Sequence, residues 1–514
     1  MSERIPTLWK KNPKVLEAGG YPLYKDHLGG VAGIRNDKCN FLVDYEDPDD
    51  PSNLIIVYEG APRYRWEEPR RDGELYDPTG LTNVSDLRPP GNLMGDSRRD
   101  RRRLVTFGYS YPADSQKHKT VSSWDKPDAF VEIAKLKRYI DMADLIEWEQ
   151  LTIDYFGLAA TPFFKAHPLS HEKVFFANEH ADTSEIHMKK WKPGVWALSW
   201  FGQVDATILN NEDLKQRYVR IYGREMERIG SRVEMIPNPI VLDGYGPECP
   251  KRENWAGQVL DKNTLVLFSI GRLEERKGFK HLLHTIKAVL DDPEVPKNFK
   301  LVIAGSGPQE EELKALATSL GINDHIIFLG RISEEDKRKA FNSAEIVCLF
   351  SDDNESQGGT IAEGQAAGAA ALVGKAFKES SLTQVENSVV QLETTEVKES
   401  KEKLKRLMMD AMWRKLIQNT GLESVKQFGI SVIMGKRFKL ANEIHYEKMR
   451  DHKRNRFSVY MNGAYGALVT GVAYATSSFF EPTQLVITSH EDLKQQYAAS
   501  YLSRHPEIAK LVLP

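Results

Sequence analysis

Cysteine is scarce in this sequence, and neither sign of charge is in excess. The 514 residues include three cysteines, Cys39, Cys249 and Cys348, which lie far apart and without the spacing of metal ligands. This usage argues against a disulfide framework or a structural zinc site and suits a reducing cytosol. The 70 Lys and Arg residues nearly balance the 73 Asp and Glu residues, so no acidic tail or basic coat indicates a class of partner.

Long apolar runs are missing as well. Residues 1–11, MSERIPTLWKK, contain no hydrophobic segment long enough for a secretory signal. The longest uncharged stretch, 457–480, is diluted by Asn, Gly, Ser and Thr and falls short of the roughly 20 mainly apolar residues that span a membrane. With 41% hydrophobic and 28% charged residues, the chain is expected to be a globular cytoplasmic protein, with peripheral contact at a membrane left open.

The second half of the chain alternates short apolar runs with helical patterns. Because 514 residues are too many for one core, two domains of roughly 200 to 250 residues are expected. The alternation predicts a doubly wound parallel sheet that binds its ligand at the carboxyl ends of the strands. The expected strands are 264–270, 299–304, 325–329 and 344–350, and the expected helices are 279–290, 309–320 and 334–342.

The first half shows weaker strand patterns between long polar and proline-rich segments, and a second α/β domain is predicted there. A helix beginning at Glu212 is expected to be capped by Asn210 or Asn211. A strand and turn over 233–239 then lead into a linker at 240–260. The other expected strands are 54–58, 103–107, 144–148, 174–177 and 206–209.

One short segment of the first half recurs near the C-terminus. Residues 212–218, EDLKQRY, are echoed by residues 491–497, EDLKQQY. The echo indicates either a duplicated strand–helix–strand unit or two capped helices that draw on the same few residues. Both interpretations stay open.

A loop and helix in the second half combine two glutamates with a pair of glycines. Glu355 follows the last expected strand, and Glu363 lies one turn into a helix that begins near Thr360. Gly358 and Gly359 let backbone amides approach a phosphate, and a helix N-terminus attracts such an anion. Ionised carboxylates accept two hydrogen bonds each and suit sugar diols. A solvated loop with two incidental glutamates is the alternative.

Two further loops follow strands of the same half. Arg272 and Lys277 flank a Gly-bounded loop, where a guanidinium and an ammonium can hold phosphates. Gly305 and Gly307 follow the next strand and could let a ligand approach the strand end. Taken singly, the first pair is also compatible with surface charge and the second with an ordinary turn.

Together and in this order, these motifs resemble the retaining glycosyltransferases of family four. Glu355 and Glu363 match the paired glutamates of that family, and the resemblance is strong over 265–390. It implies the GT-B fold, an α/β architecture of two Rossmann-like doubly wound domains facing a cleft. The segments that look like the family's phosphate loop, its Gly-bearing strand and its next strand are 271–278, 301–308 and 327–330.

The resemblance also implies roles for individual residues. Arg272 and Lys277 would bind the diphosphate, Glu355 would contact the transferred sugar, and Glu363 would hold the ribose hydroxyls. No metal and no cofactor are expected, since the cations and the helix end would stabilise the departing nucleoside diphosphate. The transfer would retain the anomeric configuration. The remaining donor-site candidates are Gly305, Gly307, Gly330, Arg331, Gly358, Gly359 and Thr360.

On the acceptor side the resemblance implies a histidine after a strand of the first domain. His180 is the candidate for this catalytic position, and Gly29 with Gly30 is preferred over Gly19 with Gly20 for the family's glycine loop. The family's pattern also implies the domains: 1–250 on the acceptor side, 251–445 around the donor, and an extension over 446–514 that returns to the first domain.

Two departures from the family pattern stand out. After Gly368 the family usually has a proline and β-branched residues, whereas this chain has the run 369–373, AAALV. The Gly-rich turn expected before Glu386 is replaced by residues 379–384, ESSLTQ. The second departure puts contacts to the far side of the sugar in doubt.

The donor implied is a nucleoside diphosphate sugar, with UDP favoured over GDP. The hydroxyl acceptor stays open among a glycan, a lipid and a modified nucleic acid. Five arginines in the segment 98–103 could attract an anionic polymer such as DNA, or could form a solvated loop with local ion pairs. A scaffold that binds without turnover, and an epimerase or phosphorylase of similar shape, are the other hypotheses.

Overall fold

The computed structural model divides the chain into two compact units, which are described separately. The first unit comprises Met1–Ile236 with Met434–Pro514, and the second comprises Pro237–Ile433. The residues that the structure describes are 8–9, 15–19, 34, 37–38, 41–42, 55–59, 105–108, 143–149, 170–180, 204–229, 231–352, 355, 357–378 and 380–454.

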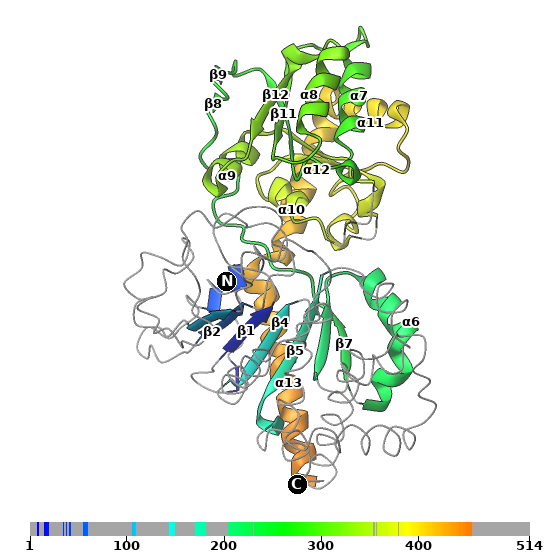
Figure 1. Ribbon diagram of the computed structural model, residues 1–514. Coiled ribbons are helices and arrows are strands. Elements are labelled where there is room, and N and C mark those ends of the chain that lie inside the picture. The colour runs from blue at the N-terminus through cyan, green and yellow to red at the C-terminus, as the bar shows by residue number, and fades with distance from the viewer. Residues whose placement is uncertain are drawn as a thin grey trace, which may run out of the picture. The chain divides into compact units, whose positions relative to one another are not determined.

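The second unit is built on a six-stranded parallel sheet with the order β12-β11-β10-β13-β14-β15 (Figure 1). The order runs outward in one direction from β10 and in the other from β13. Between these two strands lies the topological switch point, where open α/β sheets bind ligands at their carboxyl edge. The strands are β10 (Leu265–Ile270), β11 (Phe299–Ala304), β12 (Ile326–Gly330), β13 (Ile346–Leu349), β14 (Ala370–Val373) and β15 (Val390–Gln391).

Helices cover both faces of this sheet. In β11, Leu301 and Ile303 face one buried core, whereas Val302 and Ala304 face the other. This alternation is the period of two that a strand imposes, and it explains why the strands are mainly apolar. Figure 1 shows α7, α8 and α11 on one side of the sheet. The helices are α7 (Phe279–Leu290), α8 (Glu310–Ser319), α9 (Glu334–Ser343), α10 (Gly359–Ala366), α11 (Val397–Met409) and α12 (Ala411–Val425).

Short elements connect these layers. A two-stranded antiparallel hairpin, β8 (Asn254–Trp255) with β9 (Gln258–Val259), precedes the sheet. The 3-10 turns of the second unit are η6 (Glu275–Lys277), η7 (Asn323–His325), η8 (Lys375–Phe377), η9 (Ser381–Thr383) and η10 (Lys426–Phe428).

The first unit contains a seven-stranded sheet with the order β3-β2-β1-β4-β5-β6-β7, also parallel. The short η5 (Ser170–Glu172) precedes β5. The helix α6 (Glu212–Ile229) begins after Asn211, whose side chain accepts a hydrogen bond of 2.8 Å from the Leu214 N–H, so Asn211 is the cap. The strands are β1 (Val15–Gly19), β2 (Ile55–Glu59), β3 (Val105–Gly108), β4 (Leu145–Glu149), β5 (Val174–Glu179), β6 (Ala206–Leu209) and β7 (Arg232–Met235).

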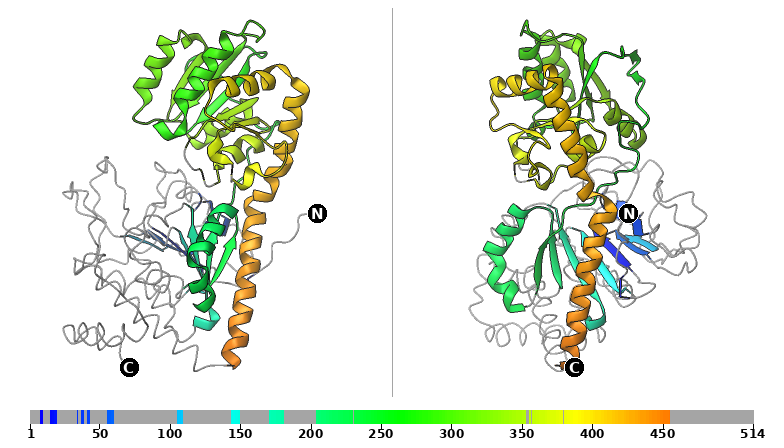
Figure 2. Two further views of the ribbon diagram at one scale, coloured as in Figure 1. Left: turned by 90° about the vertical axis from the view of Figure 1, so that its right-hand side faces the viewer. Right: turned by 180° about the vertical axis from the view of Figure 1, so that it is seen from behind.

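The helix α13 (Ile430–Arg454) begins in the second unit and has most of its length in the first. Figure 2 shows it, in orange, running alongside the strands of the first unit. Its side chains reach that sheet: Lys448 donates hydrogen bonds of 2.8 and 2.9 Å to Asp205. Residues 446–454 of the expected extension therefore continue this helix, while the echoed segment 491–497 lies outside the described residues.

The two connections between the units are joined by hydrogen bonds within the second unit. The Ile240 N–H donates to the Phe428 carbonyl and the Ile430 N–H to the Ile240 carbonyl, each at 2.9 Å. Residues 237–250 consequently pack with the second unit, which begins before the expected boundary at 250. Among the helices that the structure describes, none is long and apolar enough to cross a membrane.

Candidate active site

The loops that follow β10, β11 and β12 are bound to one another at the carboxyl edge of the second unit's sheet. The Leu273 N–H donates to the Ser306 carbonyl at 3.1 Å, and the Gly305 N–H donates to the Gly330 carbonyl at 2.8 Å. Gly305 has a φ of +124°, and a Cβ atom there would lie 1.9 Å from the carbonyl oxygen of Gly271. A glycine is therefore required at 305 by the contact between two loops.

A close contact between the same two loops also requires the glycine at 307. A Cβ atom on Gly307 would lie 2.4 Å from the Leu273 carbonyl oxygen. Gly330 has a φ of +62° with open space around it, and the neighbouring Arg331 donates from Nε to the Ser306 hydroxyl at 3.0 Å. These residues shape the loop edge, and Arg331 is exposed there.

The loop after β10 is also packed against the end of β13. Gly278 adopts a φ of +67°, and a Cβ atom there would lie 2.0 Å from the Phe350 carbonyl oxygen. The preceding turn, η6, ends at Lys277, and the Asp352 N–H donates to the Arg276 carbonyl at 2.9 Å. The loops from the two sides of the switch point are thus joined by backbone contacts.

Glu355 is the centre of a cluster of cations at this switch point. Lys277 forms an ion pair with its Oε1 atom, Arg276 approaches the same atom at 3.2 Å, and the Ser351 hydroxyl donates to it at 3.2 Å. Arg276 is in turn held by Glu274 at 2.7 Å. Within the part of the chain that the structure describes, no contact is made to Oε2 of Glu355.

Arg272 lies apart from this cluster. Its side chain is 67% exposed and forms an ion pair with Glu274 at 3.4 Å. The structure brings Lys277 and Glu355 together and adds Arg276, which sequence reasoning missed. A signal was present, since Arg276 stands directly before Lys277.

The N-terminus of α10 lies just beyond Glu355. Gly358 adopts a left-handed φ of +78° and a Cβ atom there would lie 2.7 Å from Phe377, so the turn into the helix requires glycine. Gly359 is exposed and a Cβ atom there would meet nothing within 4 Å. Its backbone amide and that of Thr360 belong to the first turn, whose unpaired N–H groups suit an anion.

Two side chains hold Glu363, in the second turn of α10. Lys337 of α9 lies 2.7 Å from its Oε1 atom, and the Tyr245 hydroxyl donates to the same atom at 2.9 Å. Burial raises the pKa of Tyr245, and the neighbouring Glu363 raises it further. Burial lowers the pKa of Lys337, but Glu363 and Glu334 outweigh it and raise that pKa. Sequence reasoning missed both partners.

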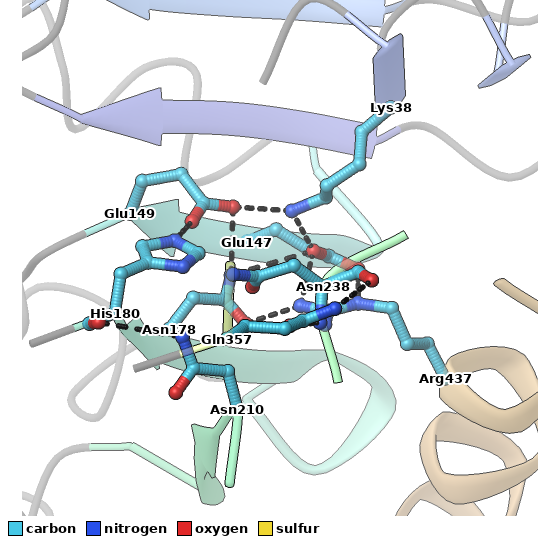
Figure 3. A network of polar contacts seen from close by, with 9 residues as sticks. All are labelled: Lys38, Glu147, Glu149, Asn178, His180, Asn210, Asn238, Gln357 and Arg437. Carbon is cyan, nitrogen blue, oxygen red and sulfur yellow. Dashed lines mark hydrogen bonds and ion pairs between the residues drawn. The ribbon is translucent and has the colours of Figure 1, made fainter. Parts of the chain in front are cut away.

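A buried glutamine fixes the loop between Glu355 and α10. Gln357 accepts a hydrogen bond of 2.5 Å from the Asn238 N–H and donates one of 3.0 Å to the Asn238 carbonyl (Figure 3). The Ser380 hydroxyl donates to the Gln357 carbonyl at 2.5 Å. These contacts hold the loop from both sides, so the position of Glu355 does not depend on its own ion pairs alone.

In the first unit, His180 follows β5 and lies in a buried network of charges (Figure 3). Its Nε2 atom contacts Glu149, at the end of β4, and its side chain is 9% exposed. Lys38 contacts both Glu149 and Glu147. Arg437 of α13 donates to Glu147 from Nε at 3.1 Å and from Nη2 at 2.7 Å.

The charges of this network compensate one another. Burial raises the pKa of Glu147, but Arg437 and Lys38 outweigh it and lower that pKa. Burial also raises the pKa of Glu149, but Lys38, His180 and Arg437 together outweigh it and lower that pKa well below its usual range. His180 directly follows β5 and lies within a network that also contains Asn178, Asn210 and Arg437. The candidates Gly29 and Gly30, and the arginine-rich segment 98–103, lie outside the described residues.

Residues 251–422, about a third of the chain, match the family model described as glycosyl transferases group 1. The matched residues lie in the second unit and include Arg272, Lys277, Glu355 and Glu363. This match supports the resemblance at the level of group 1.

Two curated relatives illustrate the similarity. The phosphatidyl-myo-inositol mannosyltransferase of Mycobacterium leprae is 34% identical over 145 residues, which are 28% of this chain and 36% of the relative. A Campylobacter jejuni N-acetyl-D-galactosaminyltransferase, named for a GalNAc-bearing diNAcBac-PP-undecaprenol, is 29% identical over 181 residues, 34% of this chain and 42% of the relative. The matches span less than two thirds of the length of these relatives.

Solved structures are similar over most of the chain. A glycosyltransferase from Rickettsia africae has a TM-score of 0.55 at 14% identity and covers 84% of this chain and 98% of its own. Anabaena HepE, solved in complex with UDP and glucose, has a TM-score of 0.50 at 14% identity. The match covers 83% of this chain and 98% of HepE. These likenesses establish the fold, and the expected GT-B architecture of two Rossmann-like domains is confirmed.

Proposed function

We propose that this chain is a glycosyltransferase that moves a sugar from a nucleoside diphosphate sugar to a hydroxyl acceptor. One observation carries the proposal: Lys277 and Arg276 converge on Glu355 at the switch point of the second unit, near Gly359, the exposed first residue of α10. Open α/β sheets bind nucleotides at this place. The match of residues 251–422 to group 1 glycosyl transferases supports the same function.

The charges suit a leaving diphosphate. As the bond to the sugar breaks, negative charge grows on the diphosphate, and preorganised cations stabilise that charge most where water is excluded. Lys277 and Arg276 are already placed by Glu355, and the exposed Arg272 side chain has the freedom to reach a phosphate from the same loop. The backbone amides of Gly359 and Thr360 add neutral donors, so the site would work without a metal.

The two glutamates would bind different parts of the donor. Glu355 lies beside the cations, and its Oε2 atom would accept a hydrogen bond from a hydroxyl of the transferred sugar. Glu363 lies one turn into α10 and would accept hydrogen bonds from the ribose hydroxyls. In this assignment the bond from the anomeric carbon to the diphosphate breaks and the acceptor oxygen bonds to that carbon from the same face, while the acceptor proton passes to the departing phosphate oxygen. The product would therefore retain the anomeric configuration of the donor.

The names of similar proteins support the choice of substrates. Anabaena HepE is named in complex with UDP, which supports UDP over GDP as the nucleotide of this chain. The mycobacterial relative is named for phosphatidyl-myo-inositol and the Campylobacter relative for an undecaprenol-linked glycan. A glycan or lipid hydroxyl is accordingly the proposed acceptor, reached from the cytoplasm with peripheral contact at a membrane.

Nucleotide binding tests the donor site first. The full chain is titrated with UDP, GDP and ADP in the presence of EDTA, and the thermal midpoint and dissociation constant are measured. One diphosphate is expected to bind, and Lys277→Met should weaken it by about 10- to 100-fold, because charge-assisted hydrogen bonds are lost. Arg272→Ala should weaken it as well.

The matched control is Lys287→Met, since Lys287 is an exposed residue of α7 paired with Asp291. This variant should bind as the wild type does. No binding of any nucleotide would refute the donor site and favour a scaffold. Turnover is then measured as release of the diphosphate from the matching nucleotide sugar, and release that needs no acceptor would favour an epimerase or phosphorylase instead.

A further inference from the structure

Three different segments meet at the Oε1 atom of Glu363. Lys337 comes from α9, Tyr245 from the segment that leads into the second unit, and Glu363 itself from α10. The side chains of Glu363 and Lys337 are 19% and 18% exposed, so the contacts are largely shielded from water. No contact to Oε2 of Glu363 is made by the described residues.

The helix α9 also fixes the position of Tyr245. The Tyr245 ring packs edge-on against Phe341, with ring centroids 6.0 Å apart. Asn342 donates to the Gly244 carbonyl at 3.0 Å and accepts from the Gly246 N–H at 3.1 Å, so the residues on both sides of Tyr245 are held. One rigid helix therefore supplies Lys337 directly and orients the tyrosine hydroxyl beside it.

Two donors on one oxygen restrict the carboxylate more than either donor does alone. With Oε1 shared by an ammonium and a hydroxyl, rotation of the Glu363 carboxylate would break two contacts at once. The second oxygen is then held in one orientation, and a preorganised acceptor binds a hydroxyl more tightly than a mobile one. A ligand that lacks the hydroxyl leaves a shielded carboxylate oxygen without a partner.

We propose that Tyr245 and Lys337 are positioning residues that hold Glu363 to accept the ribose hydroxyls, and that this arrangement makes the site selective for ribonucleotides over 2′-deoxyribonucleotides. The inference rests on the proposed function, because it takes the ligand to be a nucleoside diphosphate. It goes further in assigning two residues outside the donor motif and a specificity to them.

The test compares UDP with 2′-deoxy-UDP, or the corresponding pair for whichever base binds, by calorimetric titration of the full chain. The wild type is expected to bind the ribonucleotide about tenfold or more tightly. In Lys337→Met this ratio should fall below about threefold, because affinity for the ribonucleotide drops while that for the deoxynucleotide hardly changes. Tyr245→Phe removes one oxygen atom, keeps the ring against Phe341, and should lower the ratio in the same direction.

A matched control lies on the same helix. Lys339 pairs with Glu335 on α9 and is 35% exposed, so Lys339→Met removes the same charge without touching Glu363. Its ribose selectivity should equal that of the wild type. If Lys337→Met does not fold, as judged by circular dichroism, Tyr245→Phe alone decides.

The outcomes separate the inference from the proposed function. Equal loss of affinity for both nucleotides in the variants would show a merely structural role and overturn the inference. A wild type that binds both nucleotides equally would overturn it too, while the donor site would stand. A wild type that binds no nucleotide would overturn the proposed function together with the inference.

Discussion

Replacing Arg437 with methionine tests the buried charge network of the first unit. The Arg437 side chain is 4% exposed and donates twice to Glu147, whose side chain is fully buried. Methionine is of similar length and keeps most of the packing, so the main loss is the positive charge. The substitution leaves one buried carboxylate with a weaker set of partners.

The magnitude follows from that loss. Removing one partner of a buried ion pair costs about 3–5 kcal/mol. Lys38 still contacts Glu147 in the variant, so we expect the lower end, about 3 kcal/mol, in the free energy of unfolding of the first unit. For a unit of this size that corresponds to a fall of about 4–5 °C in the midpoint of thermal unfolding.

The assay must follow the first unit rather than the whole chain, because two units need not unfold together. Hydrogen exchange of peptides covering β4 and β5 reports their opening free energy directly. Arg450→Met is the control: Arg450 lies on the same helix, is 48% exposed, and pairs with its neighbour Asp451. It should change stability by no more than about 0.5 kcal/mol. A loss below about 1 kcal/mol in Arg437→Met would refute the reasoning.

The pH dependence gives the prediction a second readout. Because the folded state lowers the pKa of Glu147, its contribution to stability is present above the unfolded value of about 4.5 and is lost as the pH falls. Without Arg437 the carboxyl is easier to protonate in the folded state. The difference between wild type and Arg437→Met should therefore shrink below about pH 4.5, and a difference that grows there would contradict the assignment.

Three further predictions concern the second unit. Gly305→Ala should destabilise the protein by more than about 2 kcal/mol in urea unfolding, whereas Gly330→Ala, also at a positive φ but with open space around it, should cost about 1 kcal/mol. Burial raises the pKa of the Cys348 thiol to about 12, so native protein at pH 8 should be alkylated at the half-buried Cys249 and not at Cys348, as read by mass spectrometry. Burial raises the pKa of Glu399, but hydrogen bonds outweigh it and lower that pKa to about 2, so Glu399→Gln should cost about 1 kcal/mol at pH 7 and progressively less as the pH falls from about 4.5 toward 2.

The sheet of the second unit was predictable because its strands are buried on both faces. The run 299–304 is apolar except for Lys300 and ends at Gly305, and the strand limits expected from sequence agree closely with β10 to β13. The contacts of the site were less predictable. Arg276 meets Glu355, 79 residues away, only because β10 and β13 are neighbours in the sheet. The order of the strands in the sheet cannot be derived from the spacing of residues along the chain.

In the first unit, the sequence pattern of β4 predicts the strand but not the burial of its glutamates. In β4, the sequence LIEWE alternates apolar residues with Glu147 and Glu149, a pattern that predicts a strand with one face in water. Both glutamates are buried instead. Their compensating charges come from Lys38 and from Arg437, which is 290 residues away and belongs to a helix that covers this face.

An alternating strand therefore leaves two structures open, a solvated face or a face covered by a helix that carries the opposite charge. The choice depends on whether a distant helix offers cations at the right positions, and α13 does so twice. Arg437 meets Glu147 on β4, and Lys448 meets Asp205 beside β6. A single basic residue on a helix means little by itself. Arg437 and Lys448 lie about three turns apart on α13, and both contact buried or half-buried carboxylates of one sheet. This indicates that charge as well as apolar packing determines how α13 docks on the first unit.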